Sequence, residues 1–144
     1  AGCGGGPVAP QPDPAYGLEA VGAPSIRAFY QQATIFYAQL EGRRFNSLVT
    51  FRDPALRAFF RSEQAFSDYY ADLAQALTDA HFDKSRPFGV RVEEFLFEDE
   101  RTALVQVRFR GWDGRPLRPG ATDLVRLDRW DWVDGTWWLH PGKL

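Results

Sequence analysis

The chain has 144 residues and a formal net charge of -2 at pH 7. A chain of this length fits one domain, and it can bury a core without metals or disulfide bonds. Its near-neutral charge provides no general attraction to phosphate backbones, which argues against a nucleic-acid partner. No apolar run is as long as the roughly 18 residues that a membrane-spanning helix needs, so the sequence predicts no such helix.

The first 24 residues differ in composition from the rest of the chain. They contain six Gly and five Pro, and their only charged residues are Asp13 and Glu19. A segment of this kind buries too little apolar surface to offset the entropy lost on ordering. We therefore expect a flexible, partly polyproline-II tether over residues 1–24 and one folded domain over residues 25–144.

The single cysteine, Cys3, lies in this tether and cannot form an internal disulfide bond. Ala1-Gly2-Cys3, followed by a Gly/Pro-rich stretch, resembles the lipobox of bacterial lipoproteins, in which small residues precede the acylated cysteine. The resemblance implies acyl chains on Cys3 and a membrane partner in the bacterial cell envelope. With Gly4 rather than Asp after the cysteine, it implies the periplasmic face of the outer membrane. The alternative is a free thiol in a flexible end.

Three helices are predicted in the first half of the domain. Ser25 is the expected N-cap of the first helix and Gly42 its expected C-terminal cap. A shorter segment, residues 45–51, follows, and Asp53-Pro54 then predicts the start of a short helix. Ser62 is the expected start of the third helix. The apolar positions of the first helix recur at helical spacing: Ile26, Phe29, Ala33, Phe36 and Leu40.

The first predicted strand changes its alternation part-way. Val90 and Val92 lie on one side of an ideal strand, whereas Phe95 and Phe97 lie on the other. Both pairs can face one core only if an extra residue is inserted near Glu93-Glu94. The sequence therefore predicts a β-bulge there.

A later strand shows the same change of parity. Val125 and Leu127 are odd, whereas Trp130 and Trp132 are even, which predicts a second bulge near Asp128-Arg129. With that bulge, the strand positions expected to face the core are all apolar: Ala103, Val105, Val107, Phe109, Val125 and Leu127. None of these side chains can transfer a proton.

The strongest turn signal is Asp134-Gly135, between two runs of β-branched and aromatic residues. Asp-Gly supplies the two positive φ angles of a two-residue type I′ turn, so the segment predicts a terminal hairpin. Its strands hold four of the five tryptophans, which must pack against a large apolar surface. We expect an α+β fold with three N-terminal helices packed on a strongly curved, mainly four-stranded antiparallel sheet.

This order of elements over residues 25–141 resembles the nuclear transport factor 2-like superfamily of cone-shaped domains. The segment Trp130-Asp-Trp-Val-Asp-Gly-Thr-Trp137 is similar to the terminal aromatic, Asp-Gly, one residue, Trp pattern of such domains. The resemblance implies a pocket at the open end of the cone. Isomerases, cyclases and dehydratases use that pocket for catalysis, and other members are carriers or interaction modules.

We therefore expect an envelope lipoprotein with a non-catalytic ligand-binding or protein-interaction domain, and we assign no catalytic residue and no cofactor. The alternative is a small-molecule isomerase, cyclase or dehydratase with Tyr37, Tyr70, Asp128 or His140 at the cavity. The simpler interpretation of each tyrosine is a core ring with its hydroxyl at the rim. The candidates for lining the pocket are Tyr30, Tyr37, Tyr70, Trp132, Trp138 and His140.

Charged side chains suggest one further surface. Arg108 and Arg110 lie on the outward side of their strand, where they could meet an acidic envelope protein or a second copy of the sheet. A solvated charged face is the simpler alternative. His81 and His140 are far apart in sequence and match no zinc-ligand spacing, so we expect no metal site.

Overall fold

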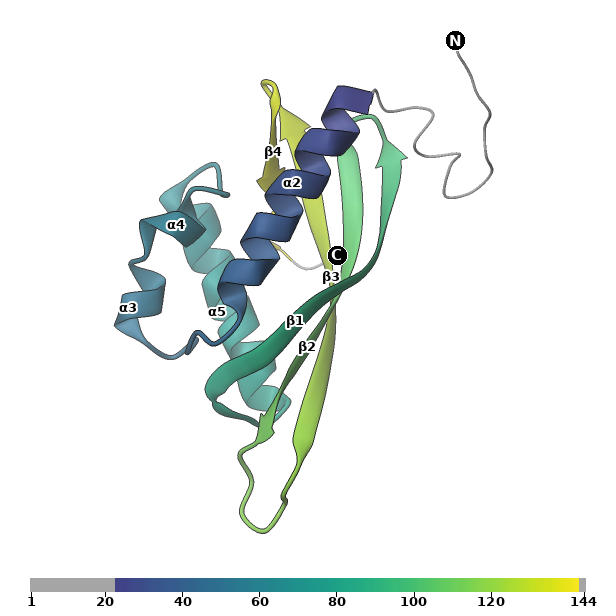
Figure 1. Ribbon diagram of the computed structural model, residues 1–144. Coiled ribbons are helices and arrows are strands. Elements are labelled where there is room, and N and C mark those ends of the chain that lie inside the picture. The colour runs from purple at the N-terminus through teal and green to yellow at the C-terminus, as the bar shows by residue number, and fades with distance from the viewer. Residues whose placement is uncertain (1–22, 143–144) are drawn as a thin grey trace.

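The computed structural model describes residues 23–142, which form an α+β domain with a curled antiparallel sheet. The predicted tether and Cys3 therefore lie outside the described residues, except for the last two tether positions. Helices gather on one face of the sheet (Figure 1). None of the described helices is both long and apolar enough to cross a membrane. The elements in chain order are α2 (Ala23–Leu40), α3 (Leu48–Phe51), α4 (Pro54–Arg57), α5 (Glu63–Asp79), β1 (Phe82–Asp99), β2 (Thr102–Asp113), β3 (Ala121–Val133) and β4 (Thr136–Leu139).

The helix starts follow the predicted caps with two differences. Asp53 caps α4 through a hydrogen bond from the Ala55 amide at 2.8 Å, and Ser62 caps α5. However, α2 begins at Ala23, so Ser25 lies inside that helix. The segment 45–51 contains the one-turn helix α3, so the described chain has four helices rather than the three predicted.

The sheet is a meander in the order β1-β2-β3-β4, and all neighbours are antiparallel. The terminal hairpin is confirmed: Asp134 and Gly135 have φ angles of 52° and 79°, as a type I′ turn requires. Trp130 and Trp137 of this hairpin are fully buried. Their rings pack at the centre of an aromatic core that also includes Phe29 of α2.

The bulge in β1 is confirmed. Val92 pairs with Val107, and the next pair joins Glu94 to Gln106, so Glu93 is the extra residue. This insertion lets β1 present apolar side chains to the core on both sides of the irregularity. Phe97, beyond the bulge, is buried.

The bulge predicted near Asp128-Arg129 was wrong. Pairing between β2 and β3 runs without a shift from Thr102↔Asp131 to Trp112↔Ala121. Since Trp130 faces the core, uninterrupted alternation turns Arg126 and Asp128 inward as well. Val125 and Leu127, expected inside, are 45% and 48% exposed. The strand tolerates this parity because its two inward charged residues have partners, as described below.

Deletion of Glu93 tests the role of the β1 bulge. Without the extra residue, one apolar pair of β1 must turn to solvent. Because a buried Phe contributes about 1.5–3 kcal/mol, we expect the free energy of unfolding to fall by about 3 kcal/mol or more. Urea denaturation measures this change. The substitution Glu93→Ala keeps the residue count and removes only exposed contacts of the side chain, so its midpoint should fall much less than that of the deletion. A deletion variant as stable as the parent would contradict the bulge's role.

Candidate functional site

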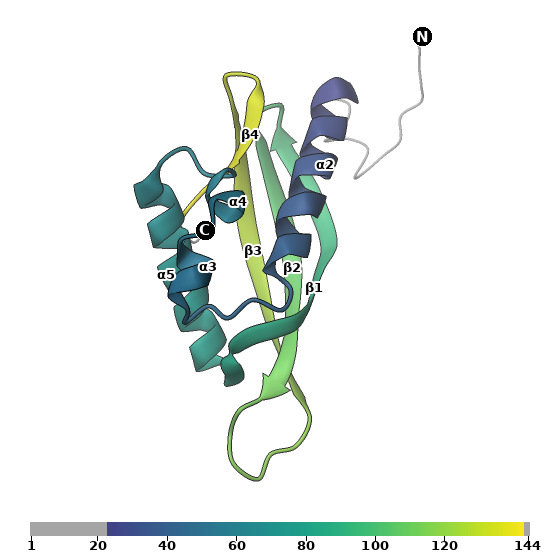
Figure 2. The same ribbon diagram turned by 60° about the vertical axis from the view of Figure 1, so that its left-hand side comes forward.

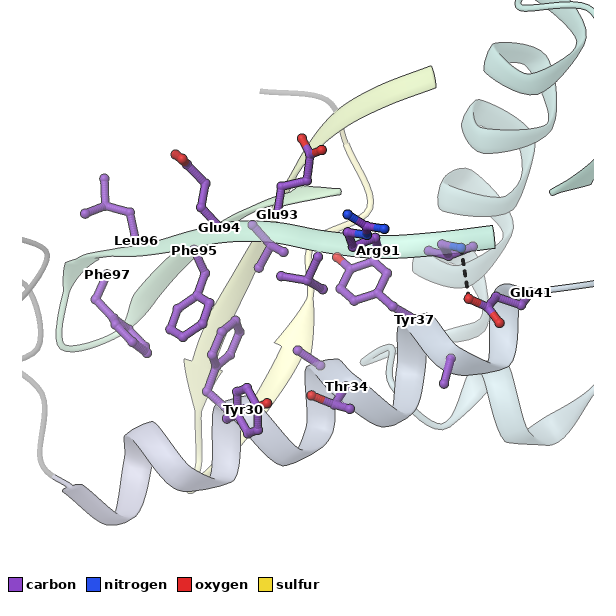
Figure 3. A pocket seen from close by; sticks show the side chains of 16 residues that line it. Tyr30, Thr34, Tyr37, Glu41, Arg91, Glu93, Glu94, Phe95, Leu96 and Phe97 are labelled. Carbon is purple, nitrogen blue, oxygen red and sulfur yellow. Dashed lines mark hydrogen bonds between the residues drawn. The ribbon is translucent and has the colours of Figure 1, made fainter. Parts of the chain in front are cut away.

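A groove of about 530 Å³ lies between α2 and β1 (Figure 3). Its apolar lining comes chiefly from the two elements that flank it. Tyr30 of α2 lies opposite Phe95 of β1 and Tyr37 lies near Arg91, whereas Leu96 points to the other side of the strand. Residues 90–97 of β1 all border the groove, because β1 is an edge strand of the sheet. The groove is thus open along one side.

The sequence of α2 explains why space remains between the helix and the strand. Ala33, Thr34 and Ala38 lie on the side of α2 that borders the groove, and their short side chains cannot fill it. At one end, the Glu41 carboxylate accepts a hydrogen bond from the Val90 amide at 3.0 Å (Figure 3). This bond connects the end of α2 to the free edge of β1.

A buried polar cluster lies behind the groove wall. Asp128 of β3 is only 3% exposed, and one of its oxygens, Oδ2, accepts hydrogen bonds from the hydroxyls of Tyr37 and Tyr69, each at 2.7 Å. Trp130 Nε1 donates to the Tyr37 hydroxyl at 3.2 Å. Tyr37 therefore has its ring at the groove and its hydroxyl in the cluster.

Arg126 provides the positive charge of this cluster. Its Nη1 donates to Asp72 Oδ2 of α5 at 3.1 Å, and its Nε lies 3.6 Å from Asp128 Oδ1. The guanidinium carbon lies 5.3 Å from the centre of the Tyr69 ring. Within the described chain, buried Nε has no hydrogen-bond partner, since the Asp128 contact is too long. Arg126 thus lies between two carboxylates, the buried Asp128 and the more exposed Asp72.

The protonation of the cluster follows from this arrangement. Burial raises the pKa of Asp128, although Arg126 and the hydrogen bonds from Tyr37 and Tyr69 oppose the increase. Burial is the main reason that the pKa values of Tyr37 and Tyr69 are raised well above the ordinary tyrosine value, and the negative charge of Asp128 is the second. The tyrosines thus stay protonated and donate to Asp128. Because Asp128, Tyr69, Arg126 and Trp130 do not line the groove, only Tyr37 connects this cluster to it.

The structure separates the residues that the sequence grouped as pocket candidates. Tyr30 and Tyr37 line the groove, and Tyr30 is 59% exposed. The Tyr70 hydroxyl instead donates to the Ser47 carbonyl at 3.1 Å. Trp138 Nε1 donates to a backbone carbonyl within its own hairpin. The remaining candidates, also outside the residues that line the groove, are Trp132 and His140.

Sequence reasoning missed three members of the buried cluster: Tyr69, Arg126 and Trp130. Asp128 was considered as a polar candidate, but at a bulge rather than on an inward position. Strand alternation could have indicated the inward position of Asp128, because Asp128 and Trp130 are two residues apart and share one side of an unbroken strand. That signal also corrects the expectation that every core-facing strand position is apolar.

Arg108 and Arg110 lie on the outer face of the sheet and have partners there. Arg108 donates to Glu93 at 2.6 Å and to Asp123 at 3.0 Å, and Arg110 donates to Asp123 at 2.8 Å. The hydrogen bond from Arg108 lowers the pKa of Glu93. Arg108 and Arg110 thus form ion pairs with carboxylates of the same sheet, which fits the interpretation of this surface as a solvated charged face.

Comparisons with known proteins add no relative. The chain matches no protein-family model, no curated protein and no solved structure. Within residues 23–142, no three His, Cys, Asp or Glu side chains lie close enough together to hold a metal ion.

Substitution of Tyr37 tests the cluster. Tyr37→Phe removes a buried hydrogen bond to a charged group, which typically costs about 1.5–3 kcal/mol in the free energy of unfolding. The double variant with Tyr69→Phe should lose more than the sum, because Asp128 then keeps neither hydroxyl donor. Urea denaturation gives these values. Tyr70→Phe is the control, and a Tyr37→Phe variant no less stable than this control would count against the cluster.

The pH dependence of stability provides a second test. The pKa of Asp128 is higher in the folded protein than in the unfolded chain. At pH values between these two pKa values, the folded state therefore binds more protons than the unfolded chain. Its contribution to the free energy of unfolding therefore falls as pH rises above the ordinary Asp pKa of about 3.9. We expect the stability of the parent relative to Asp128→Asn to decrease from acidic to neutral pH, as measured by urea denaturation across that range. A constant or increasing difference is the contrary result.

Proposed function

We propose that this chain is the ligand-binding domain of an envelope lipoprotein and that it holds an elongated, mainly apolar small molecule without transforming it. The α2–β1 groove is the observation on which this proposal rests. Its volume of about 530 Å³ falls within the range of pockets that bind small molecules, and its lining is mainly aromatic and aliphatic. We also propose that the domain belongs to the nuclear transport factor 2-like superfamily, as its helix order and curled sheet suggest.

The distribution of polar groups indicates how a ligand would lie. Phe95 and Phe97 make one end of the groove apolar, whereas Glu41 and Arg91 border the other end. An apolar body would cover the aromatic rings, and a polar end would lie near Glu41 and Arg91. This orientation keeps charged groups in water and buries the apolar part of the ligand.

A binding role fits the state of the buried titratable groups. Proton transfer requires a group within hydrogen-bond reach of the reacting atom. Asp128 is enclosed by Tyr37 and Tyr69, and the proton of the Tyr37 hydroxyl is already donated to Asp128. The two hydroxyl protons are thus engaged within the cluster, and the bond from Tyr37 holds its ring in the groove wall.

One observation favours the alternative of an isomerase, cyclase or dehydratase. Tyr37 borders the groove and is hydrogen-bonded to a carboxyl group whose pKa burial raises. An enzyme would require a ligand atom to reach the Tyr37 hydroxyl. A ligand complex with a polar atom about 2.6–3.2 Å from that oxygen would favour this alternative over simple binding.

Filling the groove tests the binding proposal. Thr34 is exposed and borders the groove, so Thr34→Trp should occupy part of the space without disturbing the core. We expect the affinity for an uncharged apolar dye, N-phenylnaphthylamine, to fall by about tenfold or more, measured by fluorescence titration. Ile35→Trp is the matched control, because Ile35 is exposed on α2 outside the groove. Equal dye affinity in the parent and Thr34→Trp would refute the groove as the binding site.

Attachment to the membrane through Cys3 is a separate part of the proposal. Because the resemblance to the lipobox implies acyl chains on Cys3, we expect the intact mass of the native protein to exceed that of its polypeptide by these chains. Mass spectrometry of protein extracted from native membranes measures this difference. Cys3→Ser should abolish the added mass, and native protein with an unmodified Cys3 would contradict the anchor.

A further inference from the structure

The β2–β3 arm, residues 112–121, ends in an apolar side chain that the fold does not use. In both views of the ribbon, this connection projects beyond the helices (Figures 1 and 2). Leu117 at the arm is 100% exposed and has a φ angle of 60°. Both features are unusual for leucine, which normally gains from burial and avoids positive φ.

The local turn shows how Leu117 is held in this position. The Arg118 amide donates to the Arg115 carbonyl at 3.3 Å, which closes a four-residue turn. Pro116 occupies its second position and Leu117 its third, the position with positive φ in a type II turn. Such turns place Gly or Asn there. A strained, solvent-exposed leucine with no contact to compensate points to a role outside the fold.

Two further exposed aromatic residues lie near the base of the arm. The rings of Phe88 and Trp112 are 4.9 Å apart, and the side chains are 44% and 59% exposed. A cavity of about 250 Å³ beside them is bordered by Arg86 and Asp83. The arm and its base thus combine three exposed apolar side chains with a hollow large enough for a small polar group.

The charge of this region differs in sign from that of the whole chain. Its basic residues are Lys84, Arg86, Arg115 and Arg118, and its acidic residues are Asp83 and Asp113. Asp113 accepts two hydrogen bonds from the Arg115 side chain, at 3.0 and 2.7 Å, so these two charges compensate each other and leave Lys84, Arg86 and Arg118 against Asp83. The region is therefore positive, although the chain carries a net charge of -2.

We propose that the β2–β3 arm docks on a lipid bilayer that contains anionic lipids. Leu117 inserts among the acyl chains, and Trp112 and Phe88 lie at the level of the headgroups, where aromatic side chains are favoured. Arg86 and Arg118 contact lipid phosphates, since basic residues near an anionic surface are attracted to it. This contact requires neither Cys3 nor the α2–β1 groove.

A bilayer fits this surface better than a protein partner does. The arm presents a single leucine on a narrow turn, whereas protein interfaces bury a broad patch with a closely packed centre. A fluid bilayer accepts such a projection without a complementary pocket. Long arginine side chains can also extend from the turn to the headgroups while Leu117 lies deeper.

The test is sedimentation of the full chain with vesicles. The Cys3→Ser form is used, so that no acyl chain contributes to binding. Vesicles of phosphatidylcholine alone are compared with vesicles that contain about one third phosphatidylglycerol, in about 0.1 M and about 0.5 M salt. We expect binding to the anionic vesicles at low salt and a large loss of binding at high salt.

Leu117→Gly is the decisive variant, because glycine suits the positive φ angle and the fold should be retained. Loss of the inserted side chain should weaken binding by about tenfold or more. Val49→Ala is the control, since Val49 is 80% exposed and lies on α3, which is away from the arm in both views of the ribbon (Figures 1 and 2). Absence of binding to anionic vesicles, or equal binding by the parent and Leu117→Gly, overturns the proposal and leaves a protein surface as the partner of the arm.

Discussion

The burial of Asp128 is the constraint on which the rest of the domain depends. A carboxylate inside an aromatic core is costly unless its oxygens are hydrogen-bonded and its charge is paired. Tyr37 of α2 and Tyr69 of α5 donate to the same oxygen, and Arg126 lies on the same strand as Asp128. Both helices must therefore lie over the same point of β3, the position of Asp128. The positions of α2 and α5 on the sheet thus depend on which residues of β3 point inward.

The groove is a consequence of this coupling. The hydrogen bond to Asp128 fixes the Tyr37 side chain, whose ring forms part of the groove wall. Short side chains such as Ala33 and Thr34 then leave the interval between helix and strand open. On the other side, the bulge at Glu93 turns Phe95 toward α2. The hydrogen bond between Tyr37 and Asp128 and the bulge at Glu93 thus shape the apolar groove between α2 and β1.

Features encoded by neighbouring residues were predictable from the sequence. The Asp134-Gly135 turn and the Ser62 cap need only local chemistry, and the β1 bulge follows from two pairs of apolar residues that share one core. The β3 parity was not predictable in this way, because its apolar residues lie outward and its charged residues inward. The partners that stabilise Asp128 are 91 and 59 residues away in sequence, where no periodicity relates them to β3. The groove depended on the same long-range bonds.

The groove and the β2–β3 arm lie on one sheet, which limits how they can influence each other. Pairing between β2 and β3 is unbroken from Trp112↔Ala121 to Thr102↔Asp131, so the arm continues the ladder that carries Asp128. The groove lies along β1, whose lining residues 90–97 run away from the arm. The proposed contact of the arm and the proposed ligand site therefore use different parts of the sheet.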